Sequence, residues 1–153
     1  MEELATARPE IAASKTRQYA TFFVSNLFFG VEVLRVQEVL RYQEMTRVPC
    51  ANSVIGGLIN LRGQIVTAFD MRERLGLEPR ESDVPPMNVV VRNEDGAISL
   101  LVDEIGDVIE VHEEDFEPPP ETISEAARET IEGVYKLDGR LLLVLSTDKI
   151  LRH

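Results

Sequence analysis

Hydrophobic and polar residues alternate in short runs along most of this chain, a pattern typical of β-strands that bury one face. In the first half, strands are predicted over residues 18–24 and 28–34, with a turn at Ser25–Asn26 between them. The apolar spacing changes over residues 36–40, which fits either a short helical turn or a bulged strand. Residues 46–49 are predicted to form a short edge strand that ends at a proline.

A hairpin is predicted in the middle of the first half. Apolar runs over residues 58–61 and 64–69 flank the pair Arg62–Gly63, where glycine supplies a positive φ. Asp70 is expected to cap one or two helical turns that end before Gly76.

The second half follows a linker over residues 78–86 that is rich in proline and charge. Its predicted strands, acidic proline-containing loop and final short helix cover, in order, residues 88–92, 97–102, 105–111, 112–125, 131–137, 140–145 and 147–151. The turn Asp138–Gly139 between the last two strands is a strong hairpin signal.

The two halves of the sequence are related by an internal repeat. A shift of 76 positions places Gly57, Leu61 and Gly63 on Gly133, Leu137 and Gly139. A shift of 69 positions matches the front of each half, pairing Val31, Val33, Val36, Glu38, Val39 and Leu40 with Leu100, Val102, Ile105, Asp107, Val108 and Ile109. The chain is therefore predicted to hold two tandem units of similar fold.

The predicted fold is all-β with short helical turns, built as two tandem five-stranded barrels. Closed barrels are favoured over open sheets because closure removes exposed strand edges. Because each barrel is small, the two are expected to share an apolar interface that forms a third core. The expected boundaries are a flexible tail over residues 1–16, one barrel over about 17–80 and another over about 86–153, with exchange of terminal segments between them left open.

Composition and charge narrow the classes of function. Hydrophobic residues make up 44% of the 153 positions, enough for a core, but no apolar run is long enough for direct membrane insertion. The formal net charge of −11 leaves no excess of Lys and Arg for nucleic acid. A polar, acidic start over residues 1–15 and a single cysteine, Cys50, indicate a reduced, cytoplasmic setting.

The sequence offers no set of residues for catalysis. His112 lies among acidic residues, His153 is the last residue, and no glycine-rich phosphate loop is present. The acidic run Glu113–Asp115 falls on a predicted loop and is typical of a solvated surface. We therefore expect no catalytic residue, no metal and no cofactor, and a function in binding.

The most distinctive segment runs from Ile55 to Val66. Its polar or small residues Asn60, Arg62 and Gly63 occupy the tip of the predicted hairpin. A guanidinium at a hairpin tip is not needed for packing, and its fork geometry suits a carboxylate or a backbone carbonyl. By this argument alone, a binding residue and an ordinary soluble turn stay equally open.

Several segments together make the chain resemble the CheW family over about residues 17–151. They are Phe29–Val31, Val36–Leu40, Thr46–Pro49, Gly57–Gly63, Phe69–Arg72, Leu101–Ile105 and Gly133–Gly139. Their order and spacing carry the resemblance, whereas any one of them would be weak. Thr67 departs from the pattern, since the family often has proline there.

The resemblance implies a fold of two SH3-like barrels and a role as an adaptor. Its partners would be the cytoplasmic tip of a chemoreceptor and the regulatory domain of a CheA-type histidine kinase, without a cofactor. The protein would be cytoplasmic and recruited to receptor arrays at the inner membrane.

The resemblance also implies binding residues. Those for the receptor would be Val33, Val36, Glu38, Gly57 and Arg62. Those for the kinase would be Val102, Ile105, Gly106, Asp138 and Gly139. Val36 is open to a second interpretation as a core residue, and Gly57 as a residue that only serves its turn.

Two other functions remain open at this stage. A CheW-like adaptor could serve a chemosensory pathway outside chemotaxis, in motility or development. An enzyme or small-ligand protein on a barrel scaffold would need a concave polar pocket with convergent titratable groups, and the sequence contains no such cluster.

Overall fold

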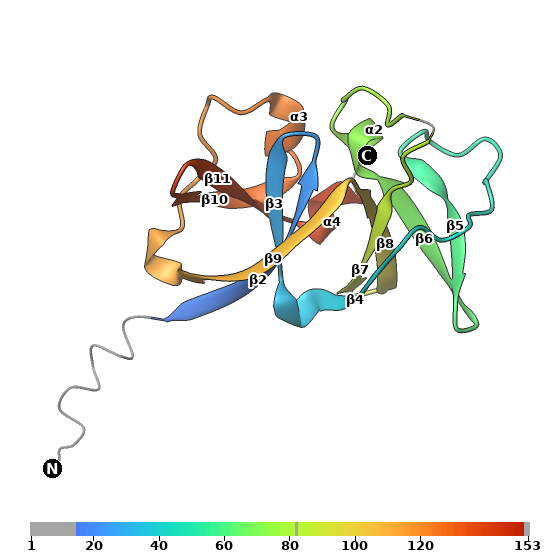
Figure 1. Cartoon of the computed structure of the whole chain (residues 1–153), viewed down its shortest axis with the longest axis horizontal. Coiled ribbons are helices and arrows are strands. Elements are labelled where there is room, and N and C mark those ends of the chain that lie inside the picture. The colour runs from blue at the N-terminus through green and yellow to red at the C-terminus, as the bar shows by residue number, and fades with distance from the viewer. Residues whose placement is uncertain (1–14, 82, 152–153) are drawn as a thin grey trace, which may run out of the picture.

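The computed structural model describes residues 15–81 and 83–151, and within them ten strands form two five-stranded sheets (Figure 1). We call the sheet ordered β4-β7-β8-β6-β5 barrel one and the sheet ordered β10-β11-β3-β2-β9 barrel two. The strands of barrel one are β4 (Val36–Leu40), β5 (Ile55–Leu61), β6 (Gln64–Asp70), β7 (Met87–Asn93) and β8 (Gly96–Val102). The strands of barrel two are β2 (Thr16–Val24), β3 (Leu27–Glu32), β9 (Glu104–His112), β10 (Ile131–Leu137) and β11 (Arg140–Leu145).

The N-terminal tail was expected over residues 1–16, and its first 14 residues lie outside the part of the chain that the structure describes. Lys15 is described, and strand β2 already begins at Thr16. The boundaries expected near residues 80 and 86 do not separate the barrels. The hairpin β2–β3 belongs to barrel two and the hairpin β7–β8 to barrel one, so each barrel takes strands from both halves of the chain.

The internal repeat appears in the strand registers. In barrel one, β6 pairs in parallel with β8, with Thr67 opposite Ile98. In barrel two, β11 pairs in parallel with β3, with Leu143 opposite Phe29. Thr67 and Leu143 are 76 positions apart, and Phe29 and Ile98 are 69 apart, the same two shifts that relate the halves of the sequence. The two barrels are therefore copies of one strand plan.

Each barrel is closed by a single bridge from the segment that follows its edge strand. In barrel one, Thr46 N donates to Leu58 O and Leu58 N donates to Thr46 O, both at 2.8 Å. In barrel two, Glu117 and Val134 make the same reciprocal pair at 2.9 and 2.8 Å. The edge strand predicted over residues 46–49 is thus reduced to one bridging residue, Thr46.

Residues 36–40, predicted as either a short helical turn or a bulged strand, form a bulged strand. A 3₁₀ turn, η1 (Val33–Arg35), precedes β4, and β4 has a bulge between Val36 and Glu38. The strand predicted over residues 28–34 therefore ends at Glu32, and Val33 lies in the turn.

Short helices end the strand runs. Asp70 caps α2 (Met71–Arg74), its side chain accepting hydrogen bonds from the backbone N–H groups of Arg72 and Glu73, which confirms the predicted cap. The final helix α4 (Thr147–Ile150) is also where the sequence predicted it. The acidic loop predicted over residues 112–125 contains the 3₁₀ turn η2 (Glu113–Asp115), and the helix α3 (Glu125–Arg128) begins at its last residue.

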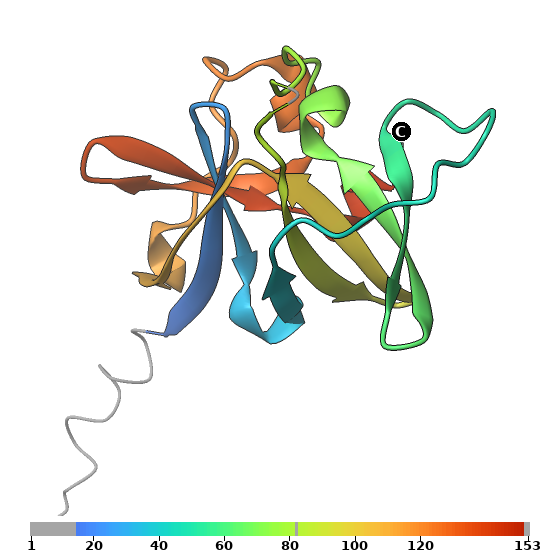
Figure 2. The same cartoon turned by 45° about the vertical axis from the view of Figure 1, so that its right-hand side comes forward.

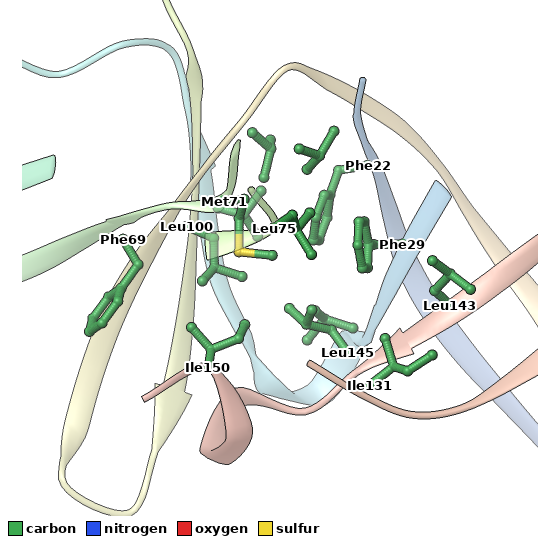
Figure 3. Close-up of a cluster of buried hydrophobic side chains, with 14 of the residues drawn as sticks. Phe22, Phe29, Phe69, Met71, Leu75, Leu100, Ile131, Leu143, Leu145 and Ile150 are labelled. Atoms are coloured by element: carbon green, nitrogen blue, oxygen red, sulfur yellow. The ribbon is translucent and has the colours of Figure 1, made fainter. Parts of the chain in front are cut away.

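Within the part of the chain that the structure describes, the buried apolar residues form three cores. The largest lies between the barrels and joins residues of both sheets, among them Phe22 and Phe29 from barrel two and Leu100 from barrel one (Figure 3). Smaller clusters fill barrel two around Tyr135 and Leu142, and barrel one around Ile59, Val66 and Val90. The shared interface is therefore the main core of the molecule.

Candidate protein-binding surface

Arg62 and Gly63 form the two-residue turn between β5 and β6, and both have a positive φ, of 52° and 86°. The sequence predicted a positive φ for the glycine alone. An arginine in the left-handed region is unusual, since its Cβ crowds the backbone. The Asn60 side chain supports the turn by accepting a hydrogen bond from Gly63 N at 2.9 Å. A two-residue hairpin turn of this kind requires a positive φ at both positions, so the turn places Arg62 in the left-handed region at an exposed tip.

The structure brings Arg62 together with Glu38. Both terminal nitrogens of the guanidinium donate to the carboxylate, with Nη2 2.8 Å from Oε1. The Arg62 side chain is 75% exposed and the Glu38 side chain 16%. Hydrogen bonding to Arg62 lowers the pKa of Glu38 and outweighs the effect of burial, which raises it. The same hydrogen bond raises the pKa of Arg62, so both groups are charged at neutral pH.

Apolar side chains lie on the elements around this ion pair. Val39 on β4, Ile65 at the start of β6 and Leu34 in η1 are exposed, while Val36 is half-buried and packs against the central core. In both views of the molecule, η1, β4 and the β5–β6 tip lie toward the same end (Figures 1 and 2). A charged pair flanked by exposed apolar residues suits a protein partner better than a small polar ligand.

Gly57 has a function within the fold. Its φ is +154°, and a Cβ at this position would lie 2.9 Å from Met45 Cβ and 2.9 Å from Thr46 O. The backbone that approaches Gly57 is thus the closing segment of its own barrel. Gly133, the repeat equivalent in barrel two, would meet its own closing segment in the same way, with Glu117 O at 2.5 Å. This internal match favours the interpretation that Gly57 serves the fold.

Of the residues expected to contact a kinase, the structure buries some and exposes others. Val102 is fully buried in the core between the barrels, so its side chain cannot reach a partner, which corrects that expectation. Ile105 on the edge strand β9 is exposed, and Gly106 packs closely on Thr21. Asp138 and Gly139 form the exposed turn between β10 and β11. Only Ile105 and this turn remain as candidates for side-chain contact.

A groove beside the Asp138–Gly139 turn was missed by the sequence reasoning. Phe23 and Phe28 pair across β2 and β3, with ring centroids 4.9 Å apart. The Arg140 guanidinium lies 5.4 and 4.9 Å from the centroids of these rings. Other residues lining the groove are Asn26, Leu27, Ile123, Gly139, Leu141 and Leu143.

The sequence does contain a signal for this groove. Each of the two strands carries two consecutive phenylalanines, and consecutive residues in a strand point to opposite faces. Phe22 and Phe29 are buried in the central core, so Phe23 and Phe28 lie on the opposite face of the sheet, where both are half-buried and Phe28 packs against the smaller cluster of barrel two.

The described residues contain no group of three or more His, Cys, Asp or Glu side chains placed to hold a metal ion. None of the helices within residues 15–81 and 83–151 is long and apolar enough to cross a membrane.

Comparisons with known proteins agree on one family. The model of the CheW-like domain matches residues 18–153. The chemotaxis protein CheW of Bacillus subtilis is 32% identical over 130 residues, covering 85% of this chain and 83% of that protein. The chemotaxis protein CheW of Klebsiella aerogenes is 28% identical over 151 residues, covering 99% of this chain and 91% of its own length.

The fold has a match among solved structures. The crystal structure of the scaffolding protein TtCheW from Thermoanaerobacter tengcongensis superposes with a TM-score of 0.78 at 26% identity, covering 86% of this chain and 90% of that one. Both the sequence and the strand arrangement are therefore similar to those of chemotaxis scaffolds.

Proposed function

This chain belongs to the CheW-like domain family, and we propose on that basis that it is a chemotaxis adaptor, a scaffold that couples chemoreceptors to a CheA-type histidine kinase. A protein of this kind binds and positions its partners and performs no chemistry. We further propose that it acts in the cytoplasm, where receptor arrays at the inner membrane recruit it.

The proposed receptor surface is centred on the Arg62–Glu38 pair. The observation that carries it is the exposed bidentate ion pair that joins the β5–β6 tip to β4, with Arg62 75% exposed beside exposed apolar residues. Val36 and Val39 supply apolar contact beside the charges. Receptor tips are helical, and a helix laid on an apolar strip rimmed by charge is a recurrent mode of recognition.

The proposed kinase surface lies on barrel two, at the Asp138–Gly139 turn and the neighbouring groove. Phe23, Phe28 and Leu27 line this groove, and Arg140 lies over the two rings. Large aromatic side chains partly covered by an arginine are typical of the residues that dominate binding energy at protein interfaces. Ile105 on β9 adds an exposed apolar residue on the same barrel.

The proposal is tested by measuring the affinity of the chain for each partner separately. The partners are a receptor cytoplasmic tip and the regulatory domain of a CheA-type kinase from the same genome. Arg62→Ala should weaken receptor binding at least tenfold and leave kinase binding unchanged. Phe28→Ser should weaken kinase binding at least tenfold and leave receptor binding unchanged. Arg47→Ala, which removes another exposed arginine of barrel one, is the matched control. If wild type binds neither partner, the adaptor function is wrong.

A further inference from the structure

The chain crosses between the two barrels at only two places within its described residues. The first crossing is η1 between β3 and β4, and the second is Asp103, the single residue between β8 and β9. Figure 1 shows the β8–β9 junction toward the end of the molecule where α2 and the β2–β3 turn lie, away from the β5–β6 tip. The second crossing is thus remote from the proposed receptor surface.

The Asp103 carboxylate is bound from both barrels. From the barrel one side, Arg72 in α2 donates through Nε at 3.1 Å and Nη2 at 2.7 Å, and Arg80 donates through Nε at 3.0 Å. From barrel two, the backbone N–H of Ser25 in the β2–β3 turn donates to Oδ2 at 2.6 Å. The Asp103 backbone N–H also donates to Phe23 O at 2.9 Å.

These charges are largely withdrawn from water. The side chains of Asp103, Arg72 and Arg80 are 16%, 20% and 11% exposed. The Asp70 carboxylate lies 3.9 Å from Arg80, so the negative charges of two carboxylates balance the positive charges of two guanidinium groups. Burial raises the pKa of Asp103, but the hydrogen bonds from Arg72 and Ser25 together with the nearby guanidinium charges outweigh it and lower the pKa. The carboxylate is therefore ionised at neutral pH, and its oxygens are fully engaged.

The other crossing has no such anchor. The 69-residue shift of the repeat places Leu34 at the position of Asp103, and Leu34 is 85% exposed. Its carbonyl oxygen accepts one hydrogen bond from Arg92, at 3.1 Å. Because the two crossings occupy equivalent places in one strand plan, the ionic cluster at Asp103 is not a requirement of the repeated fold.

We propose that Asp103 is a positioning residue that fixes the orientation of barrel two relative to barrel one. The hydrophobic effect at the interface between the barrels is non-directional, so the interface constrains their angle only through the fit of its side chains. The hydrogen bonds to Asp103 are directional and come from both sides of the junction. Its consequence for signalling rests on the proposed function: a fixed angle between the barrels would keep the receptor surface and the kinase surface at a fixed distance and orientation.

The test measures the distance between the barrels directly. Spin labels are attached to Cys50 in barrel one, which is exposed, and to an introduced cysteine, Glu132→Cys, on the exposed side of β10 in barrel two. Double electron–electron resonance then gives the distance distribution. Asp103→Asn keeps the shape of the side chain and removes its charge, and it should broaden or shift the distribution. Asp95→Asn, in the exposed β7–β8 turn, should leave it unchanged.

A purely stabilising role for Asp103 predicts a different outcome. In that case Asp103→Asn would unfold at lower denaturant, but its native distance distribution would overlay that of wild type, and this would overturn the proposal. If Asp103→Asn does not fold, Arg80→Gln removes one of the two cations and should still displace the distribution. An unchanged distribution for Arg80→Gln would equally overturn it. Neither measurement uses a partner, so this result is independent of whether the adaptor function holds.

Discussion

At the scale of single residues, Arg62 and Gly57 belong to the same hairpin and have different roles. Arg62 adopts a left-handed conformation at an exposed tip and pairs with Glu38 on another strand. Gly57 adopts a positive φ in the body of β5 and lets the closing segment approach. The conformation of Arg62 belongs to the two-residue turn and leaves its guanidinium exposed, whereas the absence of a side chain at Gly57 is needed for the barrel to close. Substitution of Arg62 should therefore affect partner binding, whereas substitution of Gly57 should lower the stability of the fold.

Gly57→Ala should destabilise the fold more than a glycine substitution in open space. We expect a loss of about 3 kcal/mol in the free energy of unfolding, since backbone strain and overpacking each cost about 1–3 kcal/mol. Gly96→Ala, where φ is +130° but no atom lies within 4 Å of the added Cβ, should lose about 1 kcal/mol. Urea denaturation gives both values. Equal losses would show that the contact with Met45 and Thr46 does not matter.

The pKa of Glu38 should rise when Arg62 is removed. The hydrogen bond from Arg62 holds this pKa below the ordinary value of 4.5, so the ion pair is present at neutral pH and is lost only as pH falls through the lowered pKa. An NMR titration of the Glu38 carboxyl carbon in wild type and Arg62→Ala measures the change. Arg47→Ala should leave the midpoint where it is. A midpoint that does not move in Arg62→Ala would mean that the pair is absent in solution.

At this scale the structure brings together two residues that the family resemblance assigned to the receptor surface, Glu38 and Arg62. The fork geometry of the Arg62 guanidinium left a carboxylate and a backbone carbonyl open as partners, and the structure shows the Glu38 carboxylate. The positive φ of Arg62 follows from the two-residue turn, which requires it at both positions. The burial of Val102 was missed because β8 is apolar on both faces, so alternation gave no indication of which residues face outward.

At the scale of elements, the molecule is two copies of one strand plan with hairpins exchanged between them. The repeat could be predicted from matching glycines and apolar positions. The assignment of β2–β3 to barrel two and β7–β8 to barrel one could not, because it depends on pairing between strands far apart in the chain, such as β11 with β3. The same applies to the closing bridges, in which Thr46 and Glu117 each act as one bridging residue without a strand around them.

The bridge at Thr46 should control the closure of barrel one. Thr46→Pro removes the N–H that donates to Leu58 O, and should cost about 2 kcal/mol of stability because an acceptor loses its partner and the local backbone is restricted. Hydrogen exchange at the Leu58 amide, which donates back to Thr46 O, should accelerate. Thr46→Val keeps the backbone N–H and is the control. Unchanged protection at Leu58 in Thr46→Pro would contradict this account of closure.

At the scale of the whole molecule, the main core lies between the barrels, so neither barrel is an independent unit. Residues of both sheets meet there, including Phe22, Phe29 and Leu100 (Figure 3). The sequence predicted this shared interface from the small size of each unit. It did not predict the ionic cluster of Asp103, Arg72 and Arg80, because charged residues at a junction cannot be told from surface charges before the fold brings them together.

The whole-molecule arrangement places the two proposed partner surfaces on different barrels. The Arg62–Glu38 pair belongs to barrel one and the Asp138–Gly139 turn to barrel two. The two proposed surfaces would let one molecule bind a receptor and a kinase at once. Coupling requires more than binding to each partner, because the state of the receptor must change the activity of the kinase through this chain.

The most direct measurement is the autophosphorylation rate of the kinase in a reconstituted mixture of receptor, kinase and this chain, with and without the receptor's stimulus. The account predicts that the stimulus changes the kinase rate when wild type is present and has no effect when the chain is left out. Arg62→Ala should bind the kinase as wild type does and fail to restore the response. A response that persists without the chain, or that is the same with Arg62→Ala, would contradict the account.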